Sequence, residues 1–157
     1  MSFTGTNDYI TGRKPVPTPA ELDVVAVRFT LDLATADLAL NTIGQIGLLP
    51  AGYVPVDVFV DATDMDTGAG AGVYQVGIWD GASASLSTAT ADGTGAWGDT
   101  GTASATAFSK AIVRTLNNIN LVTPTTVDRK IGVKVTTAPS TAAAGTLGVT
   151  VLYRAAA

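Results

Sequence analysis

The stretch VAVRFTLDL, from Val25 to Leu33, decides the fold class of this chain. Its large apolar residues stand at alternate positions, so they share one face of an extended strand and leave the other face to polar or small residues. The same period of two returns in four later segments, which are Val54 to Val60, Val73 to Asp80, Val127 to Val135 and Leu147 to Tyr153.

Three further segments add to the strand count. Thr42 to Leu48 predicts a short strand, Ala84 to Ala89 a weak one, and Ala111 to Leu116 is ambiguous between strand and helix. Turn dipeptides such as Asp80-Gly81 and Asp92-Gly93 separate the segments. We therefore expect an all-β chain of about eight antiparallel strands in a two-sheet sandwich. A jelly roll is the first choice. An immunoglobulin-type topology is the main alternative, because periodicity does not reveal strand order.

The residues before this pattern predict a separate N-terminal arm. Residues 1–21 show no periodicity, and prolines at alternate positions make the end of this segment extended and stiff. We expect an arm over 1–21 and a single β-sandwich domain over 22–157. A disordered terminus is the alternative, but large apolar groups on the arm would then face water, so we expect it to dock on a neighbouring subunit. The expected contact residues of the arm are Phe3, Tyr9, Ile10, Pro15, Pro17 and Pro19.

The two tryptophans are further candidates for contact. Residues 82–107 consist almost wholly of Ala, Ser, Thr, Gly and Asp, which predicts an exposed loop that carries Trp97 to a partner. Trp79 falls on the polar face of its strand, so it too is expected at the surface. Exposed aromatic rings can stack on sugars, although packing in a core or an interface is the commoner role.

Composition and charge argue against nucleic acid and membrane partners. Only 14% of the residues are charged, against about 25% in a typical domain. The net charge is −4 and the nine basic residues are scattered, whereas phosphate binding needs clustered Lys and Arg. The two adjacent pairs, Arg13-Lys14 and Arg129-Lys130, are expected in solvated loops or at strand edges. No apolar run approaches the ~20 residues that cross a bilayer. No signal peptide is visible, so synthesis in a cytoplasm is expected.

The sequence predicts no enzyme, no cofactor and no metal centre. It contains no His and no Cys, which removes the commonest general base and two common metal ligands. Ser109-Lys110 is a dyad by adjacency alone, and adjacent residues on a strand point to opposite faces. The densest acidic cluster lies between Asp57 and Asp66, where side chains that cap turns are expected and a calcium site is the alternative.

Several of these segments together resemble a known family. They are the run from Asp37 to Gly52, then VDVFVD at Val56–Asp61, DMDTG at Asp64–Gly68, VGIWDG at Val76–Gly81 and VTVLY at Val149–Tyr153. The chain resembles tailed-phage virion proteins of the head-decoration, or capsid cement, type over roughly Val25 to Tyr153.

The resemblance implies a small β-sandwich that binds the outer surface of a mature capsid. It implies contact with the major capsid protein and with itself, as a homotrimer, in a virion assembled in the host cytoplasm. Two alternatives remain open at this stage. One is another virion component, in the tail or at head completion. The other is a glycan- or receptor-binding virion module, which the tryptophans would serve.

Overall fold

The computed structural model describes residues 1–20, 23–68, 72–100, 113–114 and 118–156. Within them it contains eight strands and three short 3₁₀ turns. No helix in this part of the chain is long and apolar enough to cross a membrane. The strands are β1 (Val24–Leu33), β2 (Ile43–Leu49), β3 (Tyr53–Ala62), β4 (Val73–Trp79), β5 (Gly98–Asp99), β6 (Val113–Arg114), β7 (Arg129–Thr137) and β8 (Gly145–Ala155). The 3₁₀ turns are η1 (Thr35–Leu38), η2 (Thr90–Asp92) and η3 (Asn118–Leu121).

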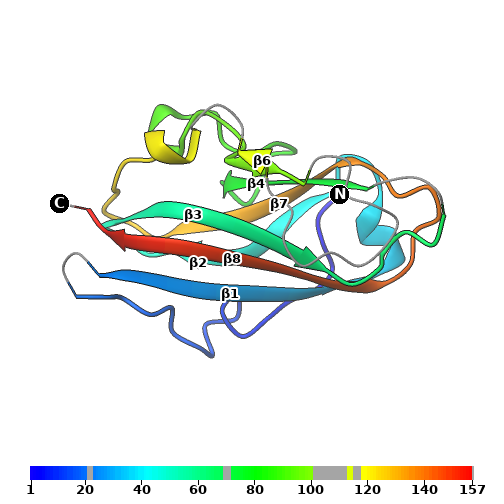
Figure 1. The fold of residues 1–157 in the computed structure, drawn as a ribbon, viewed down its shortest axis with the longest axis horizontal. Helices are drawn as coiled ribbons and strands as arrows, with labels where there is room; N and C mark the ends of the chain where they lie inside the picture. The colour runs from blue at the N-terminus through cyan, green and yellow to red at the C-terminus, as the bar shows by residue number, and fades with distance from the viewer. Residues whose placement is uncertain (21–22, 69–71, 101–112, 115–117, 157) are drawn as a thin grey trace.

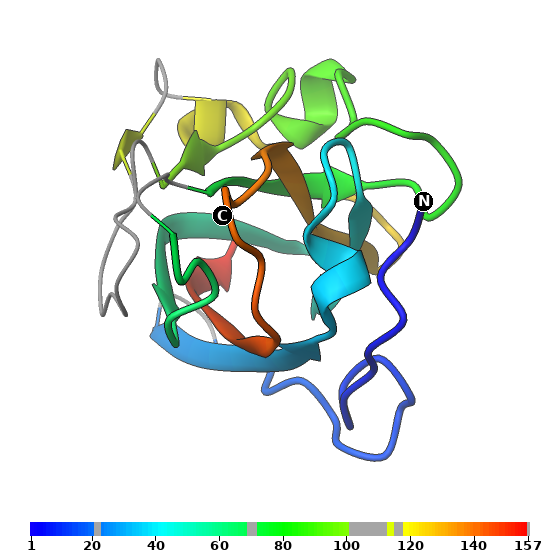
Figure 2. The same ribbon diagram turned by 90° about the vertical axis from the view of Figure 1, so that its right-hand side faces the viewer.

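The strands form two sheets that face each other (Figures 1 and 2). One sheet has the order β1-β8-β3 and the other β2-β7-β4-β5-β6, and every strand pair is antiparallel. The first four strands therefore alternate between the sheets, β7 then pairs with β4 in the same sheet, and the first strand pairs with the last. The predicted all-β two-sheet sandwich is confirmed.

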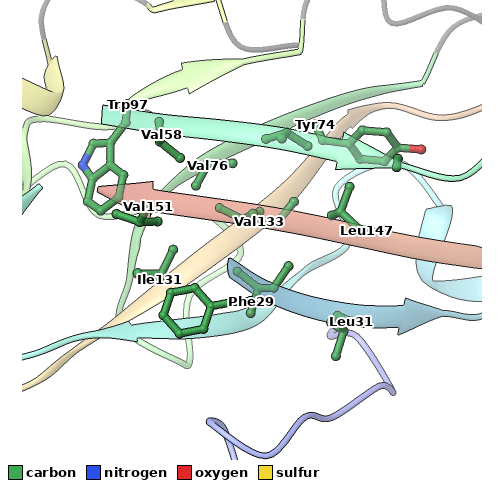
Figure 3. Packing of buried hydrophobic residues seen from close by; sticks show 14 of the residues in the cluster. Phe29, Leu31, Val58, Tyr74, Val76, Trp97, Ile131, Val133, Leu147 and Val151 are labelled. Carbon is green, nitrogen blue, oxygen red and sulfur yellow. The ribbon is translucent and has the colours of Figure 1, made fainter. Parts of the chain in front are cut away.

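The core fills the space between the two sheets. The alternating residues of β1, β4, β7 and β8 point inward from both sides, and Figure 3 shows how their side chains meet in the middle. Those nearest the centre are fully buried or nearly so, among them Phe29, Leu31, Val76, Ile131, Val133, Leu147 and Val151. The period of two thus places the core as the sequence predicts.

β3 departs from the predicted single face. Val58 and Val60 are buried as expected, but Val54 and Val56 are only half-buried and Pro55 is buried between them. The register against β8 shifts between Pro55 and Asp57, which marks a β-bulge. A bulge adds one residue to one strand and reverses the alternation on one side of it. The expectation that all four valines share the inner face was therefore wrong for the first two.

Two other predicted segments need correction. Ala84 to Ala89 is not a strand; it runs over the outer face of the β2-β7-β4 sheet, where Leu86 packs with Trp79 and Ile43. Val127 was assigned to the inner face, but β7 begins only at Arg129 and Val127 is 65% exposed. Of the ambiguous segment 111–116, only the pair in β6 lies within the described residues.

Phe29 of β1 packs directly against Gly47 of β2 in the facing sheet. A Cβ atom on Gly47 would lie 2.6 Å from the Phe29 ring, far inside van der Waals contact. The bare backbone of β2 at this position therefore lets the ring lie directly against it.

We expect Gly47→Ala to destabilise the fold by about 1–3 kcal/mol through overpacking, and Phe29→Ala by about 3–5 kcal/mol through the cavity it leaves. Because the new methyl group would enter that cavity, Gly47→Ala should cost less in the Phe29→Ala background than in the wild type. Urea unfolding of the four chains measures this coupling, and strictly additive effects would contradict the contact.

Candidate functional site

The first residues of the arm extend the sheet at the free edge of β2. Ser2 forms a parallel bridge with Ile43. The Ile43 amide donates to the Met1 carbonyl at 3.1 Å, and the Phe3 amide donates to the Ile43 carbonyl at 3.3 Å. An edge strand offers unpaired backbone groups to any passing chain. Here the chain's own N-terminus takes those groups at Ile43.

The next two residues lock the arm in place. The Phe3 ring covers Gly44, where a Cβ would approach it to 2.6 Å. The Thr4 amide donates to Asp37 Oδ1 at 2.9 Å and its hydroxyl donates to Asp37 Oδ2 at 2.9 Å. Asp37 is 1% exposed and also accepts the Ala34 amide at 2.9 Å. A buried carboxylate needs such donors, so Thr4 and Asp37 stabilise each other's position.

Asn7 links the two sheets at this side of the sandwich. Its Nδ2 donates to the carbonyls of Thr30 in β1, at 2.9 Å, and Ile46 in β2, at 2.8 Å. Its Oδ1 accepts the amides of Tyr9 and Ile10, at 3.0 and 2.9 Å, which turns the arm back outward. One amide side chain thus closes the gap between two strand edges that belong to different sheets.

The rest of the arm packs along the same side of the domain (Figure 2). The Tyr9 ring meets Phe29 edge-on, with centroids 4.9 Å apart, and Lys14 lies over Tyr9 at 5.0 Å. In the Pro-rich part, the hydroxyl of Tyr153 donates to the Pro17 carbonyl and that of Tyr53 to the Pro19 carbonyl, the latter at 2.8 Å. Burial raises the pKa of Tyr153. That hydroxyl therefore stays protonated, and remains a donor, beyond the pH at which an ordinary tyrosine ionises.

The outer face of the β1-β8-β3 sheet carries an ion pair that lies flat. Arg28 of β1 reaches across β8 to Asp61 of β3, and Arg28 Nε donates to Asp61 Oδ1 at 3.0 Å. The pair passes over Gly148, where a Cβ would meet both side chains. The hydrogen bond with Asp61 raises the pKa of Arg28. The two charges neutralise each other above Gly148, which has no side chain.

Two members of the acidic cluster, Asp64 and Asp66, cap turns as predicted, whereas Asp57 and Asp61 lie within β3 and Asp61 pairs with Arg28. Asp64 accepts the Asp66 amide at 3.2 Å, and Asp66 accepts the Gly68 amide at 3.0 Å. Asp66 also accepts the amides of Ser140 and Thr141, at 2.8 and 2.9 Å, so it ties the β3–β4 loop to the β7–β8 loop. Burial acts to raise the pKa of Asp66, but the hydrogen bonds donated by Thr141, Ser140 and Gly68 outweigh it and lower the pKa. The described residues contain no group of three potential metal ligands.

A comparison with solved structures identifies relatives of this architecture. A chain from the capsid of Ralstonia phage GP4 is 30% identical, with a TM-score of 0.72, and the match covers 96% of this chain and 96% of that one. The chain belongs to this family of phage capsid proteins. A chain from the cyanophage Pam1 capsid asymmetric unit matches at 20% identity and a TM-score of 0.49, over 92% of this chain and 96% of that one, and carries no weight here. No protein-family model and no curated protein matches the sequence.

The structure places the arm residues predicted for this capsid protein against its own domain. Phe3, Tyr9 and Ile10 are half-buried and pack on the core of the same chain. Pro15 and Pro17 are exposed and Pro19 is half-buried. The apolar side chains are thus already covered, which removes the original reason for placing a neighbour over them. Their role in partner binding stays a prediction.

Both tryptophans are buried, contrary to expectation. Trp97 is 0% exposed, and its ring enters the main core near Val151 (Figure 3). Its amide donates to the Val76 carbonyl at 2.7 Å and its Nε1 to the Asp92 carbonyl at 3.2 Å. Trp79 does lie on the outer face of β4, as predicted, but it is covered by Leu86 and is 7% exposed. The segment around Trp97 is poor in apolar residues, and the buried indole anchors it to the core. Because Trp79 and Trp97 are both buried, neither ring is available to stack on a sugar.

Arg129 was expected in solvent and is instead 7% exposed. Its Nη1 donates to the Ala91 carbonyl at 2.8 Å and to Asp92 Oδ1 at 3.0 Å. Asp92 in turn accepts the Ser87 hydroxyl at 2.6 Å. Since a buried guanidinium is tolerated only with partners, this ion pair fixes the 80–97 segment to the start of β7.

The polar groups that hold the arm were missed by sequence reasoning. Thr4, Asn7 and Asp37 are ordinary turn residues in the sequence, and nothing local distinguishes them. Their partners lie 23 to 39 residues away along the chain. The available signal was the presence of two glycines, Gly44 and Gly47, inside one predicted strand, because glycine in a strand interior indicates a close approach of another segment.

We expect Asn7→Ala to lower the free energy of unfolding by about 1–3 kcal/mol, because the carbonyls of Thr30 and Ile46 lose their hydrogen-bond donor. Thr6→Ala is the matched control, since Thr6 is an exposed neighbour on the same arm and surface changes stay within about 0.5 kcal/mol. Denaturant unfolding compares the two, and equal stabilities would disprove the bridging role of Asn7.

The lowered pKa of Asp66 predicts the direction of a pH effect. Its carboxylate stabilises the fold fully above the ordinary value of 3.8, and this stabilisation disappears as the pH falls through the lower folded value. Asp66→Asn should therefore lower the melting temperature at pH 7, with the difference from wild type shrinking below about pH 4. A difference that is constant from pH 7 to pH 2 would contradict this.

Proposed function

We propose that this capsid-family protein decorates the outer surface of a mature phage capsid and stabilises it by bridging neighbouring capsid subunits. The observation that carries the proposal is its relationship to the GP4 capsid chain, which spans 96% of both chains. A match of that extent shares the whole domain, so a common mode of assembly is the simplest expectation for both.

The surface chemistry supports this proposal. A net charge of −4 disfavours contact with packaged DNA, and an outer sheet face with a self-neutralised Arg28–Asp61 pair presents no strong field to a partner. A chain with only 14% charged residues suits broad protein–protein contact, in which few charges have to be desolvated.

The proposed partners are the major capsid protein and further copies of this chain, as a homotrimer. The proposed location is the exterior of the virion, after synthesis in the host cytoplasm, with no nucleic acid or membrane partner. Of the predicted contact residues, those of the arm remain proposed, and exposed Pro15 and Pro17 are the most accessible: Phe3, Tyr9, Ile10, Pro15, Pro17 and Pro19.

The other candidate functions gain less support. Burial of Trp79 and Trp97 removes the aromatic platform on which a glycan-binding role would depend. A place in the tail or at head completion differs from decoration chiefly in copy number.

Copy number is therefore the test. Cryo-electron microscopy and quantitative mass spectrometry of virions that carry this protein should find it on the outside of the shell, in a fixed ratio near unity to the major capsid protein. A handful of copies at one vertex, in the tail or inside the shell would overturn the proposal.

A further inference from the structure

The contacts of the first seven residues define a peptide-binding site on the domain. Its parts are the edge of β2 at Ile43, the bare backbone at Gly44, the carboxylate of Asp37, and the carbonyls of Thr30 and Ile46. Each part matches one feature of the segment from Met1 to Asn7. The segment from Met1 to Asn7 therefore resembles a peptide ligand that is covalently attached to its own binding site.

The segment that joins this ligand to the domain is long and partly packed. Residues 11–15 are all exposed, whereas Tyr9, Ile10 and Val16 pack on the core, and the Pro17 and Pro19 carbonyls are held by Tyr153 and Tyr53. The nine residues 8–16 can span about 30 Å when extended, which is about the diameter of a small domain. Once Tyr9, Ile10 and Val16 leave the core, the anchor at Pro17 can stay in place while the first seven residues reach an adjacent copy.

We infer that this site binds residues 1–7 of a second copy of this chain, so that arms are exchanged between neighbouring copies. Exchange reproduces the contacts of Phe3, Thr4 and the Asn7 Nδ2 on an identical site, and it gives up the packing of Tyr9 and Ile10 on their own core. In dilute solution the arm of the same chain occupies the site, because its effective concentration is of millimolar order. Where copies stand side by side, as the proposed function requires, the neighbour's arm has a comparable effective concentration and competes for the site.

A complementation experiment with full-length chains tests the inference in solution, without capsids. An arm-disabled chain carries Phe3→Ala and Asn7→Ala and keeps its site intact. A site-disabled chain carries Gly44→Ala, whose methyl group would collide with the Phe3 ring, and keeps its arm intact. Neither chain can dock its own arm, so cis competition is removed in both. The control replaces the site-disabled chain by one that carries all three substitutions.

We expect the mixture of the first two chains to form a one-to-one heterodimer in native mass spectrometry, with a fraction that rises with concentration. The control mixture should show no such species. A complementing mixture that remains monomeric up to about 1 mM, the scale of the cis effective concentration, would overturn the inference.

A second measurement uses only wild-type chains, so it does not depend on whether the variants fold. Wild-type chains with and without ¹⁵N label are unfolded, mixed and refolded at rising concentration, and mixed dimers are counted by mass. Mixed dimers that appear only at high concentration support exchange, and their absence at every concentration counts against it. Because neither experiment contains capsid, failure here leaves the proposed decoration role to its own test.

Discussion

Two glycines in β2 determine how closely the facing sheet and the N-terminal arm approach that strand. Gly47 receives the Phe29 ring from the facing sheet, and Gly44 receives the Phe3 ring from the arm. A side chain at either position would push one of these aromatic residues away. The thickness of the sandwich at this side and the docking of the arm thus depend on the same short strand.

That strand lies at the edge of its sheet, which explains why the arm is needed. Edge strands expose backbone groups that invite pairing with other chains. At this side the carbonyls of Thr30 and Ile46 come from edges of two different sheets, and the single amide of Asn7 satisfies both. The arm therefore acts as part of the fold, although the sequence alone marks it as an appendage.

The period of two was sufficient to find the long strands and their inner faces, because a half-buried strand imposes that period on its own residues. It failed at β3, where a bulge reverses the alternation after Pro55, and a bulge leaves no periodic trace. The period of two also failed to predict which outward-facing side chains are exposed to solvent. Trp79 lies on the predicted outer face of β4, but Leu86, seven residues later, covers it. Whether the outer face of a sheet is exposed to solvent depends on whether a later loop packs over it, and the sequence of the strand itself does not contain that information.

The same argument explains the polar groups that the sequence did not reveal. Asn7, Asp66 and Arg129 each join segments that are distant along the chain, and each is held by at least two partners. A chain with 14% charged residues has few such groups to distribute. Those named here lie where a loop or arm meets the sandwich. Satisfied hydrogen bonds of this kind are directional and specify one arrangement of the segments that they join. Because these bonds hold the loops and the arm in one arrangement, those segments are the parts that can define how the protein meets a neighbour.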